Sequence, residues 1–80
     1  MARFLLHHRH DAGDCGVVFA SFRGHDSELR HRAALATCAF GGHAIWWTVD
    51  APDEARALGL LPYFVAERAT AIEVGEVWIP

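Results

Sequence analysis

The chain has 80 residues and a formal net charge of -3, and 52% of its residues are hydrophobic. This length fits one domain, and so much apolar material in a small domain favours burial of part of it against a partner chain. The acidic balance argues against a basic surface for nucleic acid. No apolar run approaches the roughly 20 residues that cross a bilayer, and the N-terminus lacks the apolar region of a signal peptide. We therefore expect a cytoplasmic protein with reduced cysteines.

The first expected element is a strand over RFLLHHRH, residues 3–10, whose alternation places His8 and His10 on one face. The turn DAGD follows, and apolar residues at the spacing of a helical stripe then predict a helix that ends at Gly24. This stripe consists of Cys15, Val18, Phe19 and Phe22. Residues 25–32, HDSELRHR, have no period and are expected to form a surface connection or a single helical turn.

A hairpin is the clearest local pattern in the chain. Two apolar runs, AALATCAF and HAIWWTVD, flank Gly41-Gly42, and a two-residue glycine turn between such runs is typical of a β-hairpin. With this turn Cys38 pairs with Ile45, which makes Cys38 and His43 diagonal neighbours on one face. The predicted hairpin therefore brings a thiol close to an imidazole.

The second half of the chain is expected to hold a helix and a closing strand. Pro52, Asp53 and Glu54 are typical of a helix start, because proline fits the first turn and acidic residues favour the positive end of the helix dipole. Pro62 should end or kink this helix, so PYFVAER is expected to form a second turn or a loop. Alternating apolar residues in TAIEVGEVWI, residues 70–79, predict the last strand.

These elements follow the βαββαβ order of ferredoxin-like α+β domains, in which both helices cover one face of a four-stranded antiparallel sheet. The predicted hairpin carries apolar residues toward both faces, with Trp47 on one side and Trp46 on the other. A solvent-facing side would normally alternate with polar residues. We therefore expect the second face to pack against the sheet of an identical subunit, which predicts a homodimer.

Two stretches, WWTVDAPDEARALGLL and ATAIEVGEVWIP, resemble the strand with its helix start and the closing strand of small members of the dimeric α/β-barrel group. In layout the chain is also similar to small bacterial families of uncharacterised function and to nickel-binding ferredoxin-like proteins. The resemblance implies two sheets packed face to face. Members of the group include monooxygenases, isomerases and cyclases, so the resemblance selects no activity.

The chain is rich in residues that bind transition metals, with six histidines and two cysteines. Neutral imidazole and thiolate suit Ni, Zn and Cu, although no CxxC or HExxH spacing is present. In a ferredoxin-like sheet the first strand lies beside the second hairpin strand, so one ion can gather His8 or His10 with Cys38 and His43. These four residues form the candidate metal site. The alternative is that Cys38 is a small buried apolar residue and that the histidines are solvated.

Other interpretations of the same residues stay open. Trp46 and Trp47 either line a site for a small aromatic ligand between subunits or pack in the dimer. His8 or His10 can be the general base of a cofactor-independent isomerase, cyclase or monooxygenase, which needs a histidine poised near neutral pH. Cys15 either begins the apolar helix stripe or is a reactive thiol at a helix N-terminus. A structural or assembly role also fits, so the sequence leaves open whether the protein is an enzyme.

Overall fold

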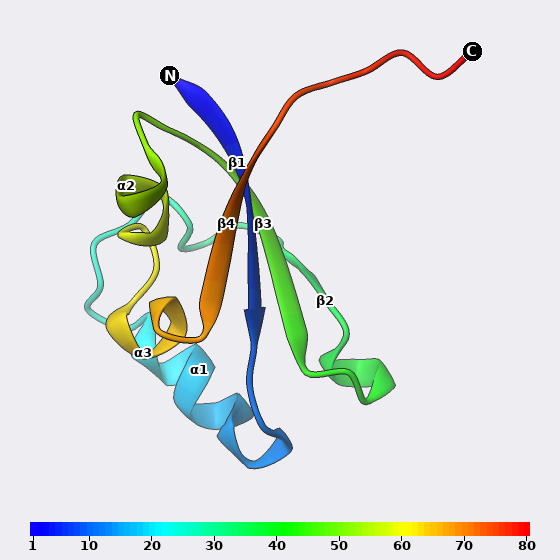
Figure 1. Cartoon of the computed structure of the whole chain (residues 1–80). Coiled ribbons are helices and arrows are strands. Elements are labelled where there is room, and N and C mark those ends of the chain that lie inside the picture. The colour runs from blue at the N-terminus through cyan, green and yellow to red at the C-terminus, as the bar shows by residue number, and fades with distance from the viewer.

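The computed structural model describes residues 1–80 and contains four strands and three short α-helices. The elements in chain order are β1 (Ala2–Arg9), α1 (Cys15–Ser21), β2 (Leu35–Ala36), β3 (Ala44–Ala51), α2 (Glu54–Leu58), α3 (Tyr63–Ala66) and β4 (Ala69–Val74). Two 3-10 turns, η1 (Ala12–Asp14) and η2 (Cys38–Phe40), precede α1 and β3. Figure 1 shows the strands in one layer, with the three helices on the same side of it.

The strands form one antiparallel sheet in the order β2-β3-β1-β4. In the central pair Phe4 lies opposite Val49 and Leu6 opposite Trp47. On the other side of β1, Leu6 lies opposite Ala71 of β4. The predicted α+β class with a four-stranded antiparallel sheet is confirmed, and the order of elements and strands is consistent with a ferredoxin-like fold. The face-to-face dimer stays a prediction.

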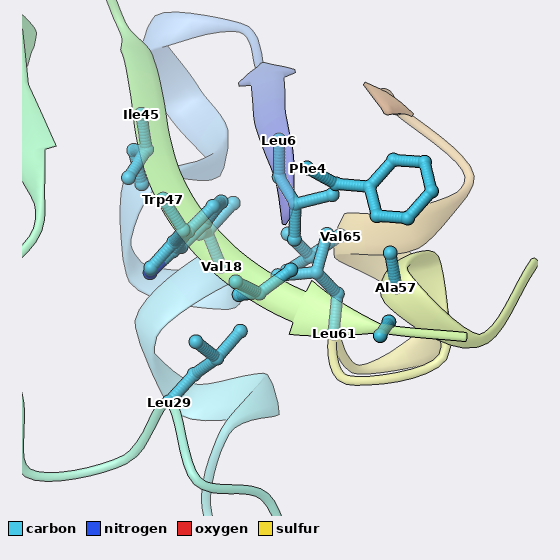
Figure 2. Packing of buried hydrophobic residues seen from close by; sticks show 11 residues of the cluster. Phe4, Leu6, Val18, Leu29, Ile45, Trp47, Ala57, Leu61 and Val65 are labelled. Carbon is cyan, nitrogen blue, oxygen red and sulfur yellow. The ribbon is translucent and has the colours of Figure 1, made fainter. Parts of the chain in front are cut away.

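The hydrophobic core lies between the sheet and the helices. Leu6, Val18 and Val65 are fully buried there, and Trp47 packs close to them from β3. Figure 2 shows these side chains meeting from β1, α1, α3 and β3. Burial of each such side chain contributes about 1.5–3 kcal/mol to the stability of the fold. The core thus fixes α1 and α3 against the same face of the sheet.

The second helix begins where the sequence predicts, although Pro52 lies before the cap and not in the first turn. The carboxylate of Asp53 accepts a hydrogen bond from the backbone N–H of Arg56 at 2.8 Å and so caps α2. This helix ends at Leu58, before Pro62, as the sequence predicts. The segment PYFVAER then forms α3, a single turn of helix whose Val65 is buried.

The predicted two-residue hairpin turn is wrong, and so is the register derived from it. Ala36, and not Cys38, pairs with Ile45. The backbone N–H of Thr37 donates to the carbonyl of Ala44 at 2.9 Å, and the N–H of Ala44 donates to the hydroxyl of Thr37 at 3.1 Å. Thr37 and Ala44 therefore close a longer loop that contains η2. Cys38 lies in this loop instead of on a strand.

The closing strand is shorter than predicted. β4 ends at Val74, which lies opposite Arg3 near the start of β1. Beyond this pair almost nothing of β1 remains, so the residues after Val74 have no partner strand despite their alternating sequence. Residues 75–80 leave the sheet without regular structure (Figure 1), and Trp78 is 92% exposed.

The second face of the sheet carries a mixture of apolar and polar side chains. Trp46 stacks on His7 with 5.0 Å between ring centroids, and Ile72 is 58% exposed. Leu5 on the same face is half-buried, whereas Thr48 is exposed. None of the helices has the length and apolar character needed to cross a membrane.

Candidate metal centre

Four metal-binding side chains meet at one end of the sheet. They are His10, which follows β1, Cys15 at the start of α1, Cys38 in η2 and His43 just before β3. One ligand atom from each residue lies within 4.8 Å of all the others. Figure 1 shows why these segments meet: the end of β1, the start of β3, the start of α1 and the turn after β2 all lie at the lower end of the sheet in that view.

The distances between the ligand atoms fit one tetrahedral ion. With Zn–S bonds of about 2.3 Å and Zn–N bonds of about 2.0–2.1 Å, tetrahedral geometry places a nitrogen and a sulfur ligand about 3.5 Å apart. Cys15 Sγ lies 3.2 Å from His10 Nε2 and 3.2 Å from His43 Nδ1. Cys38 Sγ lies 3.7 Å from His10 Nε2. An ion at the centre therefore needs side-chain shifts of only a few tenths of an ångström along these three edges.

A chain of hydrogen bonds fixes the orientation of His10. His8 is completely buried, and its Nδ1 lies 3.0 Å from the carbonyl oxygen of Val65, which can only accept, so this nitrogen donates. In neutral His8 the other nitrogen, Nε2, is then an acceptor, and it receives the Nδ1–H of His10 at 3.1 Å. In its neutral form His10 consequently presents a lone pair at Nε2, the nitrogen that faces the two thiols. A metal ligand needs this tautomer.

The environment of His8 keeps it neutral. Burial, the largest cause, lowers the pKa of His8 from its ordinary value of 6.5, because the charged form would lose its water. The neighbouring His10 lowers the same pKa further, while the hydrogen bond to Val65 acts in the opposite direction. His8 therefore serves as a hydrogen-bonded support behind a ligand, since both of its ring nitrogens are engaged.

Cys15 lies at the centre of the cluster, in contact with both imidazoles. Burial raises the pKa of the Cys15 thiol above its ordinary value of 9.0, and the adjacent Cys38 thiol raises it further. In the metal-free protein Cys15 is therefore a protonated thiol at neutral pH. Of the two interpretations of Cys15, the reactive thiol at a helix N-terminus is therefore not supported, because burial and the second thiol dominate.

The loop before β3 holds His43 in an unusual backbone conformation. Its φ is 50°, in the left-handed region that residues with a Cβ seldom adopt. Gly41, two residues before His43, ends η2 with a φ of 85°. Glycine adopts this left-handed conformation without a steric penalty, because it has no Cβ. The carbonyl of His43 also accepts the backbone N–H of His10 at 3.1 Å. The loop thus presents the imidazole of His43 to the cluster and ties its backbone to a second ligand.

The structure places the predicted site residues in different surroundings. It brings His10, Cys38 and His43 together, although by a loop and not by the predicted strand register. His8 lies behind His10 and outside the set of four ligand atoms. Trp47 packs in the core beside Phe22, and Trp46 lies on the opposite face of the sheet against His7.

Cys15 is the ligand that the sequence did not single out. Its spacing to Val18 and Phe19 also fits an apolar helix stripe, which explains the residue without a ligand role. The signal that distinguishes the two is its position at the first residue of the helix, directly after the turn that follows His10. A turn this short between two ligand residues brings their side chains together.

Comparison with known proteins gives no match: no family model, no curated protein and no solved structure is similar to this chain. The interpretation of the cluster therefore depends on its own geometry.

Proposed function

We propose that this protein binds a single transition-metal ion, Zn²⁺ before Ni²⁺ or Cu²⁺, through His10, Cys15, Cys38 and His43. The observation that supports this proposal most strongly is the chain of hydrogen bonds from Val65 through His8, which leaves the free lone pair of His10 facing both thiols. Such outer partners orient metal-bound histidines in many sites.

The donor set favours zinc in a closed site. Two thiolates and two imidazoles at tetrahedral spacing are typical of structural zinc, whereas catalytic zinc sites usually keep three protein ligands and an open position for water. Nickel and copper in their divalent states prefer square-planar or tetragonal surroundings. Four protein ligands would fill a tetrahedral shell, so the ion's role in this proposal is to hold the fold and not to activate a substrate.

A mixed iron–sulfur cluster fits these residues less well. In a Rieske centre two histidines bind one iron and two cysteines bind the other, so the imidazoles and the thiols form separate pairs. Here Cys15 Sγ lies 3.2 Å from each of two imidazole nitrogens, His10 Nε2 and His43 Nδ1. This interleaving of nitrogen and sulfur supports a single ion.

The ion would join segments that are distant in the sequence. It would connect the end of β1 to the start of α1, to η2 and to the start of β3. The chain buries only 15 of its 80 residues, so its apolar core is small. A bound metal stabilises the folded state by about 2.7 kcal/mol when its free concentration is 100 times its Kd.

The alternative of an enzyme with a histidine general base has less support. His8 is completely buried and has both ring nitrogens in hydrogen bonds, so it offers no free lone pair to a substrate. A thiol nucleophile at Cys15, with His10 or His43 as its base, is compatible with the 3.2 Å distances. The raised pKa of Cys15 disfavours the thiolate that a nucleophile needs, and the presence of a second thiol favours metal binding over that role.

We also infer that the protein forms a homodimer through the face of the sheet opposite the helices. Trp46, Leu5 and Ile72 lie on this face and give it an apolar centre. In this arrangement Trp46 packs at the subunit interface. The cluster lies on the other side of the sheet, so metal binding and dimerisation can be tested separately.

The metal proposal is tested by titrating the full chain, purified without an affinity tag, with Zn²⁺ and Co²⁺. We expect one ion per chain and, with Co²⁺, the visible absorption of a tetrahedral thiolate site. Cys15→Ser and Cys38→Ser should each weaken Co²⁺ binding and reduce that absorption. His31→Asn is the matched control, because His31 is exposed, lies outside the cluster, and has a left-handed φ that asparagine tolerates. Serine variants that bind as tightly as the natural chain would contradict the proposal.

A further inference from the structure

A second candidate site lies on the helix side of the sheet, outside the metal cluster. It is a groove of about 460 Å³ between α1, the segment that follows it, and the edge formed by β2 and β3. Ile45 and Trp47 are buried at its base, and Phe19 of α1 is 58% exposed at its side. This volume lies within the usual range for small-molecule sites. None of the four cluster residues lines the groove.

The charges around this groove differ from those of the whole chain. The protein has a net charge of -3, yet the groove is lined by three of its seven arginines and by no aspartate or glutamate. Arg32 pairs with Glu28 at 3.7 Å, whereas Arg23 and Arg30 form no ion pair with a carboxylate. The groove therefore combines an apolar base with guanidinium groups that have no anionic partner.

We propose that this groove binds a small amphipathic carboxylate with an aromatic or aliphatic body. The body of such a ligand would cover Phe19 and lie against Trp47, which removes apolar surface from water. Its carboxylate would pair with Arg23 or Arg30, since the planar guanidinium matches a carboxylate in bidentate geometry. A neutral ligand of the same shape would gain the apolar contact without the ion pair.

The test compares phenylbutyrate with phenylbutanol, two probes of the same shape and different charge, by calorimetric titration of the full chain. Phenylbutyrate should bind about tenfold or more tightly than phenylbutanol. Arg23→Gln and Arg30→Gln should each weaken the binding of phenylbutyrate and leave the binding of phenylbutanol unchanged. Arg56→Gln, on α2 and outside the groove, is the matched control and should change neither.

A variant that fills the groove provides the second arm. Ala36 is exposed on β2 and lies opposite Ile45 at the base of the groove, so Ala36→Phe adds bulk where little packing is disturbed. It should abolish binding of both probes while the circular dichroism spectrum and the metal content stay unchanged. The proposal is overturned by equal affinity for the two probes, by no binding at millimolar concentration, or by binding that Ala36→Phe leaves intact.

Discussion

The role of His8 as the support of a metal ligand can be tested by removing its two polar atoms. In His8→Leu the carbonyl of Val65 loses its donor and the Nδ1–H of His10 loses its acceptor, both in the interior. Each unpaired buried group costs about 1–3 kcal/mol, so the free energy of unfolding of the metal-free protein should fall by about 2–6 kcal/mol. Loss of an outer partner typically weakens metal binding about 10–100-fold.

Urea unfolding of the metal-free chain and competition with a chromophoric zinc chelator measure the two effects separately. His8→Gln is the informative partner variant, since its amide oxygen can still accept the Nδ1–H of His10. It should recover part of the metal affinity. His7→Leu is the control, because His7 is next in the chain but lies on the opposite face of the sheet. Unchanged zinc affinity in His8→Leu would refute the idea that the hydrogen bond between His8 and His10 orients a ligand.

Further predictions concern pH, the loop and the dimer. Since folding lowers the pKa of His8, the unfolded chain binds a proton at this residue at a higher pH than the folded chain does. As the pH drops below about 6.5, the free energy of unfolding should therefore decrease by up to about 1.4 kcal/mol per pH unit until the folded pKa is reached. His8→Gln should remove this slope in urea titrations. Because thiols must lose protons to bind zinc, the zinc affinity measured with the chelator should rise between about pH 6 and about pH 8. A flat profile would exclude thiolate ligation. Gly42→Ala places a Cβ against the side chain of Thr37 and should lower both stability and zinc affinity, whereas Gly13→Ala, with open space around it, should change neither. Trp46→Lys should convert the homodimer to a monomer in light scattering without loss of zinc; a wild-type monomer at all concentrations would contradict the dimer.

Local chemistry explains why much of the fold could be predicted. The start of α2 depends on residues adjacent in the sequence, so the pattern of Asp53 and Glu54 after a proline predicts it. The alternation in β1 likewise reports which side chains face the helices, and Leu6, His8 and His10 are buried as that alternation requires. These features need no knowledge of distant contacts.

The geometry of the site depends on contacts that the local pattern does not contain. Gly41-Gly42 fits a two-residue turn, but the pairing of Thr37 with Ala44 produces a longer loop and moves Cys38 off the strand. Cys15 matches an apolar stripe because helical spacing does not reveal which neighbour its thiol meets. The residue types of the site were therefore predictable, whereas its fourth ligand and the role of His8 required the three-dimensional arrangement.

X-ray absorption spectroscopy at the zinc edge tests the central proposal most directly, because it counts the sulfur and nitrogen ligands of the bound ion. The zinc-loaded full chain should show two sulfur neighbours at about 2.3 Å and two imidazole nitrogens at about 2.0–2.1 Å. Cys15→Ser should lose one sulfur neighbour. A first shell that consists only of oxygen and nitrogen would contradict the assignment of Cys15 and Cys38 as ligands.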